Sequence, residues 1–161
     1  MKHTLSVLVE NRPGVLARVA GLFSRRGFNI DSLAVGRTED PTLSRMTIVV
    51  DAEEHFLEQV IKQLHKLINV IKISDLDPHA SVGRELVLMK VQASGKNRAE
   101  IVAIADIFRS KIVDVSRASL TLEITGTADK LAAIEDLLKP YGISELARTG
   151  KIALARGVKE K

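Results

Sequence analysis

The segment Glu10–Leu16 contains the residues whose types and spacing best suit ligand binding. Its polar turn, Asn11-Arg12-Pro13-Gly14, leads directly into apolar residues with helical spacing, and a proline suits the first turn of a helix. A helix start exposes unpaired N–H groups and the positive end of the helix dipole, which favour a carboxylate. Gly14 has no side chain to cover these donors, and the Asn11 amide can both donate and accept. The segment can therefore hold both charged groups of an amino acid; an ordinary helix start with a turn glycine is the other interpretation.

The residue patterns that catalysis usually requires are absent from the sequence. The chain has no cysteine, which excludes a thiol nucleophile, a disulfide, an iron–sulfur cluster and a Cys-rich zinc site. No histidine lies three or four positions from another, as a helical zinc-binding pair would. Glu53 and Glu54 open a helix, where the dipole favours negative charge. A nucleophile elbow, a Walker loop and a dinucleotide-binding glycine pattern are also missing. We therefore predict no catalytic residue, no metal site and no cofactor in this chain.

Composition narrows the class of protein further. The 161 residues are 45% hydrophobic and 27% charged, which is typical of a folded globular protein with one ordinary domain or two small ones. Aromatic residues make up only 3%, so few side chains could stack on nucleic-acid bases. The net charge of +4 is distributed over both halves of the chain. There are 10 basic and 9 acidic residues up to Leu76, and 14 basic and 11 acidic residues after it. This pattern indicates no nucleic-acid partner, and the lack of a long apolar run or cleavage signal predicts a cytoplasmic protein without a membrane partner.

Hydrophobic spacing predicts the element order β-α-β-β-α-β in the first half of the chain. The first helix carries an apolar stripe from Val15 to Phe23 and ends at Gly27. An Asp51-x-x-Glu54 cap opens the second helix, whose stripe continues to Ile68. The strands are predicted at 4–10, 28–35, 45–50 and 70–73.

The same order is predicted again after a linker at 77–81. The expected elements are strand 85–91, helix 97–110, strands 112–115 and 120–124, helix 128–138 and an extended tail. The apolar residues of the first helix match those of the third at a constant offset of 85 residues. Those of the second helix match those of the fourth at an offset of 74 residues. We therefore expect two domains, residues 1–77 and 78–161.

The predicted fold class is α+β, with two ferredoxin-like βαββαβ units. Each unit would form an antiparallel sheet with both helices on one face. The other face and the strand edges would stay uncovered. Small units of this kind usually cover them by pairing with another copy. We expect a homodimer.

A resemblance to a known family rests on several segments of the sequence. Leu5–Leu16 followed by Gly21–Leu33 resembles an ACT domain, and more narrowly the small regulatory subunits of acetolactate synthase (acetohydroxyacid synthase). The similarity covers the whole chain. The further segments that resemble this family are Asp40–Ile48, Gln63–Leu67, Val91–Ser94, Ile107–Arg109 and Gly126–Thr127.

The resemblance implies a non-catalytic chain that activates the acetolactate synthase catalytic subunit. It also implies feedback inhibition, usually by valine, in branched-chain amino-acid synthesis. The catalytic partner would carry thiamine diphosphate, Mg²⁺ and FAD. In this family the effector lies between two ACT domains, and the matching positions are Asn11, Gly14, Val15 and Leu16 with Asn29 and Ile30 of the partner chain. The C-terminal unit would supply dimer and catalytic-subunit contacts.

Two other functions share parts of this pattern. A free-standing ACT-type sensor acting on transcription or on another enzyme would bind an amino acid without affecting acetolactate synthesis. An RNA-recognition motif has the same element order, but it needs aromatic residues on its central strands, and Arg45–Val50 has none.

Overall fold

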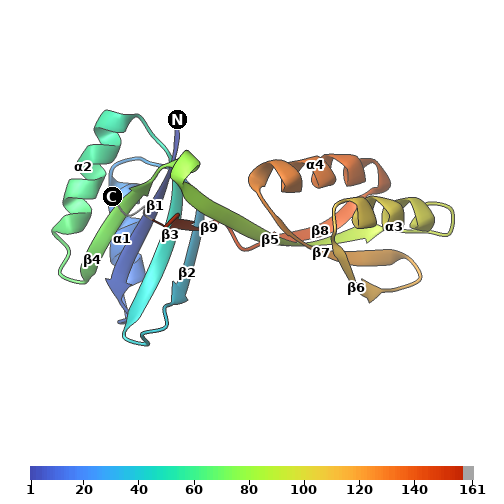
Figure 1. The fold of residues 1–161 in the computed structure, drawn as a ribbon, viewed down its shortest axis with the longest axis horizontal. Helices are drawn as coiled ribbons and strands as arrows, with labels where there is room; N and C mark the ends of the chain where they lie inside the picture. Colours follow the sequence, from blue (N-terminus) through green and yellow to red (C-terminus); the bar gives the residue numbers. More distant parts are fainter. Residues whose placement is uncertain (158–161) are drawn as a thin grey trace. The chain divides into compact units, whose positions relative to one another are not determined.

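The chain forms two units, each an antiparallel sheet with two helices on one face (Figure 1). The computed structural model describes residues 1–157. The first unit comprises residues 1–83 and the C-terminal segment 151–157, and the second comprises residues 84–150. The expected second domain, 78–161, also included residues 78–83 and that C-terminal segment, and its residues 158–161 lie outside the described part.

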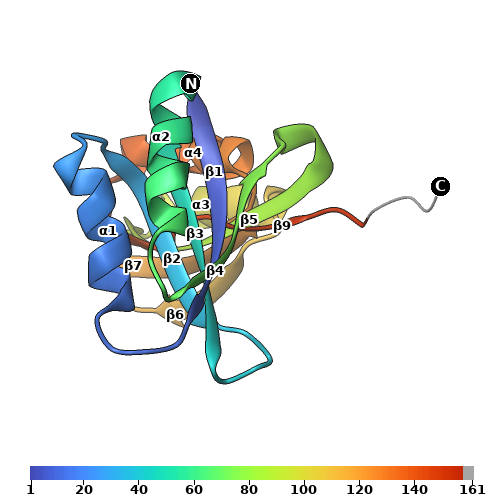
Figure 2. The ribbon, with the colours of Figure 1, turned by 90° about the vertical axis from the view of Figure 1, so that its left-hand side faces the viewer.

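The first unit has the predicted βαββαβ order. Its strands pair antiparallel in the order β2-β3-β1-β4. Both helices lie on one face of this sheet (Figure 2), and a short 3₁₀ turn, Pro78–Ala80, follows the last strand. The elements are β1 (Lys2–Glu10), α1 (Val15–Arg25), β2 (Ile30–Arg37), β3 (Leu43–Asp51), α2 (Glu54–His65) and β4 (Val70–Leu76).

Alternate residues of the two central strands build the core of the first unit. They pack beneath apolar residues of both helices, because side chains on one face of a strand recur every second residue and those on one face of a helix every three or four. Phe23 is the one aromatic side chain among the buried core residues. The buried strand residues are Leu5, Val7, Val9, Met46, Ile48 and Val50, and the buried helix residues are Val15, Val19, Phe23, Leu57, Val60 and Leu64.

The second unit repeats this arrangement with the strand order β6-β7-β5-β8. Its helices bury Ile101, Ala105, Leu131, Ile134 and Leu138 against the sheet. The last strand, β9 (Ile152–Ala155), pairs with β5, whose first residues belong to the first unit. The remaining elements are β5 (Ser81–Gln92), α3 (Arg98–Ile107), β6 (Lys111–Val115), β7 (Ser119–Gly126), α4 (Ala128–Leu138), the 3₁₀ turn Lys139–Tyr141 and β8 (Ile143–Arg148). The predicted fold class is therefore confirmed.

Two local predictions around α2 are wrong. Glu53 is the residue before the helix, and it makes no side-chain cap; Asp51 ends β3 and its Oδ1 accepts from the N-terminal amine at 2.9 Å. This charge-assisted bond outcompetes capping and lowers the pKa of the Asp51 carboxyl. The helix ends at His65, so Ile68 lies beyond it and is exposed.

The offset between α1 and α3 also differs from the prediction by one residue. Val15 and Val19 are buried in α1, whereas Ile101 and Ala105 are buried in α3, an offset of 86. At the predicted offset of 85, Ile107 would match Leu22, which packs on the core, yet Ile107 is 76% exposed. The apolar types of α3 fit either register, and packing against the sheet selects one.

Within residues 1–157, no helix is long and apolar enough to cross a membrane.

The register of α3 can be tested by two matched substitutions. Ile101→Ala empties a fully buried site and should lower the free energy of unfolding by about 2–5 kcal/mol. Ile107→Ala alters an exposed site and should change it by no more than about 0.5 kcal/mol. Urea unfolding of both variants measures the difference. Equal losses would contradict the observed register.

Candidate functional site

The backbone at the end of β1 places Asn11 beside the β2–β3 loop. Asn11 N donates to Thr42 O at 2.7 Å, and Asn11 Nδ2 donates to Pro41 O at 3.2 Å. These two bonds fix the side-chain amide. Within the described residues its Oδ1 accepts no hydrogen bond, so this oxygen can accept one from a ligand.

Gly14 shapes the start of α1. Its φ of 83° is left-handed, a conformation that side chains strain, whereas a Cβ would meet no atom within 4 Å. Gly14 makes no side-chain cap, and the helix ladder begins with Arg18 N donating to Gly14 O at 3.1 Å. The N–H groups of Leu16 and Ala17 thus have no acceptor within the helix. The α1 start is an open donor group, as the sequence predicts.

The two apolar residues that follow Gly14 have different environments. Val15 is buried in the core, so only its backbone can contribute to a ligand site. Leu16 is 43% exposed, although the sequence pattern places it in the apolar stripe of the helix. An apolar side chain at the surface beside open N–H groups suits the aliphatic part of a ligand.

Asn29 and Ile30 lie at the other end of α1. The helix ends at Arg25, Gly27 turns the chain with φ 76°, and Phe28 N donates to Phe23 O at 3.0 Å. Asn29 is exposed, and Ile30 begins β2, the edge strand. Eleven residues of helix span about 16 Å. One chain therefore brings Asn11, Gly14, Val15 and Leu16 together at one end of α1 but holds Asn29 and Ile30 at the other (Figure 2).

A polar network that the sequence does not reveal supports the α1 start. Glu10 Oε2 accepts from Arg12 Nε at 2.8 Å and from Asn69 Nδ2 at 3.5 Å. Arg18 Nη1 donates to Asn69 Oδ1 at 2.8 Å. Asn69 thus links the end of β1 to the second turn of α1. No local motif connects Arg18 with Asn69, because they are 51 residues apart and meet only through the sheet register.

Histidines and carboxylates form no metal-binding group of three in the described part of the chain. His3 Nδ1 lies 3.5 Å from Asp75 Oδ2, at the opposite end of β1 from the α1 start.

Comparison with known families accounts for both units. Residues 5–72 match the family described as the AHAS small subunit-like ACT domain, and residues 84–157 match the small subunit of acetolactate synthase. The chain belongs to the family of acetolactate synthase small subunits. This confirms the resemblance stated from the sequence.

Individual relatives of this small-subunit chain agree along its whole length. A probable acetolactate synthase small subunit of Archaeoglobus fulgidus is 61% identical over 160 residues, which is 99% of this chain and 100% of the relative. The acetolactate synthase small subunit of Mycolicibacterium smegmatis is 59% identical over 155 residues, which is 96% of this chain and 91% of the relative. The crystal structure of the small subunit from Thermotoga maritima has a TM-score of 0.91 at 43% identity and covers 99% of both chains.

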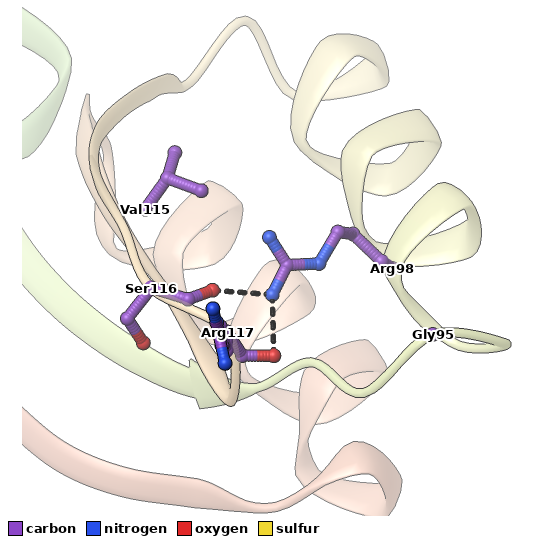
Figure 3. A pocket seen from close by; sticks show the side chains of 5 residues that line it. All are labelled: Gly95, Arg98, Val115, Ser116 and Arg117. Carbon is purple, nitrogen blue, oxygen red and sulfur yellow. Dashed lines mark hydrogen bonds between the residues drawn. The ribbon is translucent and has the colours of Figure 1, made fainter.

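A concave region lies in the C-terminal unit (Figure 3). It has a volume of about 560 Å³ and is lined by Gly95, Arg98 and the residues Val115–Arg117. The Arg98 guanidinium donates from Nη2 to three carbonyl oxygens, those of Ala93 at 3.0 Å, Arg117 at 2.9 Å and Ser116. Arg98 therefore ties the end of β5 to the β6–β7 turn, and this role explains it without a ligand.

Proposed function

We propose that this chain is the regulatory subunit of acetolactate synthase, which activates the catalytic subunit and makes it sensitive to inhibition by valine. The observation that carries the proposal is the open helix start at Gly14, within an ACT domain of the acetolactate synthase small-subunit type. The catalytic partner supplies the active site, with thiamine diphosphate, Mg²⁺ and FAD. This chain supplies the amino-acid site.

The groups at the α1 start match the two charged groups of valine. The carboxylate accepts from the N–H groups of Leu16 and Ala17 at the positive end of the helix dipole. The ammonium donates to Asn11 Oδ1, whose amide the β2–β3 loop orients. The isopropyl group packs on the exposed side chain of Leu16.

A second copy of the chain completes the site. The outer edge of β2 is free for pairing within the described sheet, and such edges commonly pair with another chain. Antiparallel association along β2 and α1 places the start of one helix beside the end of the other. Asn29 and Ile30 of the second copy then close the site over Gly14, and residues 1–77 act as the effector-binding and dimerising domain.

The energies involved favour such a two-chain site. A metabolite sensor with a dissociation constant near ~100 μM needs about −5.5 kcal/mol. A carboxylate at a helix start contributes about 0.3–1 kcal/mol, or up to ~2 when partly buried. Burial of an isopropyl group adds about 1.5–3 kcal/mol. One surface supplies too little, so groups from both chains act together.

This arrangement also provides a route for regulation. Valine between two ACT domains stabilises the relative orientation in which both half-sites reach it. A ligand shifts an equilibrium only by its differential affinity for the two states. The catalytic subunit responds to that orientation through its contacts with the small subunit, including those of the C-terminal unit.

The proposal is tested by acetolactate formation from pyruvate, with the catalytic subunit of the same organism, in the presence and absence of this chain across a valine titration. We expect activation that valine reverses. An unchanged rate at every valine concentration would contradict the proposal and favour the free-standing ACT-type sensor.

Gly14→Asp should abolish valine inhibition while activation persists. The new carboxylate lies at the helix start, where it occupies the open donors and repels the carboxylate of valine. Gly14→Ala is the control, because it imposes at least as much left-handed strain as Gly14→Asp but adds no charge. The inhibition constant is read in the same assay. If Gly14→Asp and Gly14→Ala weaken inhibition equally, strain and not charge explains the effect.

Subunit mixing tests whether each site draws on two chains. Gly14→Asp and Asn29→His should each remove inhibition when present alone. In a mixed dimer one site carries both changes and the other carries neither, so random mixing restores about a quarter of all sites. Valine inhibition of the mixed sample should therefore return in part. A mixture as insensitive as its parents would place Gly14 and Asn29 of one chain in one site.

A further inference from the structure

The face of the first sheet that points away from α1 and α2 carries an ordered set of polar residues. On β1, Ser6 lies directly opposite Thr47 of β3 and Ser74 of β4. Leu8 lies opposite Arg45 of β3 and Lys72 of β4. Neighbouring strands are about 4.8 Å apart. Arg45 and Lys72 therefore flank Leu8 in one row across the sheet, and the hydroxyl-bearing residues form the next row.

These polar groups have few partners within the chain. Arg45 Nη1 donates to Ser6 Oγ at 2.8 Å, and Ser6 is only 4% exposed. Neither Arg45 nor Lys72 forms an ion pair with a carboxylate of residues 1–157, and the hydroxyl groups of Ser6 and Ser74 donate to no acceptor in that range. A half-buried guanidinium with only a neutral partner favours an anion.

The C-terminal segment supplies an apolar wall beside these donors. Strand β9 returns to the first unit (Figure 1). Just before β9, Lys151 Nζ donates to Thr4 Oγ1 at 3.3 Å. Just after β9, Arg156 N donates to Ala80 O at 2.8 Å. The resulting pocket has a volume of about 280 Å³ and is lined by Ser6, Arg45, Lys72, Ser74, Leu76, Leu154 and Ala155.

We propose that this pocket binds a small aliphatic carboxylate. The planar guanidinium of Arg45 suits the two oxygens of a carboxylate, and Lys72 and the serine hydroxyls offer further donors. Leu76 and Leu154 accommodate the hydrocarbon part. No lining residue is acidic, so an ammonium group would meet two cations and no carboxylate there, which disfavours free amino acids. It shares no residue with the α1 start and does not rest on the proposed regulatory function.

The test uses the full chain and isovalerate as the probe, followed by amide shifts in ¹⁵N NMR spectra. We expect saturable shifts at Ser6, Ser74 and Leu154. Isovaleramide, the neutral analogue of the same shape, should cause none. Arg45→Met and Lys72→Met should each weaken binding by about tenfold or more, the usual loss for a charge-assisted bond.

Lys62→Met, on the exposed side of α2, is the matched control and should bind isovalerate as the unaltered chain does. Lys72→Met changes an exposed residue, so it keeps the test valid if Arg45→Met fails to fold. Three outcomes overturn the proposal. They are the absence of saturable shifts, equal affinity in Lys72→Met, and shifts caused by inorganic phosphate but not by isovalerate.

Discussion

Apolar packing of each sheet against its two helices is the constraint on which each unit depends. Alternate residues of β1 and β3 pack beneath α1 and α2, and this requirement fixes the strand register as well as the rotation of both helices. Because Val15, Val19 and Phe23 must face the sheet, Leu16 points outward beside the helix start. The same register aligns Ser6, Arg45 and Lys72 on the sheet face opposite the helices. Core packing therefore determines where both sets of polar groups lie.

The helix start at Gly14 is an open donor site because no side chain within residues 1–157 caps it. A serine or aspartate cap, which adopts an extended backbone, would satisfy the first-turn N–H groups, but it would also occupy the donors that a ligand carboxylate requires. The left-handed backbone at Gly14 explains why a glycine stands there. The polar network of Glu10, Arg18 and Asn69 then holds the uncapped helix against β1.

Local patterns predicted those features that depend on local physics. Strands β1–β7, the four helices, the turn at Gly27 and the exposed start at Gly14 follow from residue types within a few positions, whereas β8 and β9 were expected only as an extended tail. The failures involve competition between distant groups. Asp51 pairs with the N-terminal amine rather than capping α2, and packing shifts the buried face of α3 by one residue. Asn69 and β9 reach their places only through the tertiary fold, so no window of sequence reveals them.

The two polar sites of the first unit differ in the charge that they can balance. In the proposed effector site, Asn11 Oδ1 would accept from an ammonium group, and the helix N–H groups would balance a carboxylate without adding a full positive charge. The pocket beneath β9 has two full cations and no acid. Coulomb repulsion there acts against a zwitterion, whereas a simple carboxylate gains from both cations. Under the two proposals, amino acids and deaminated acids of similar shape would be separated by charge, with each class favoured at a different face of the same sheet.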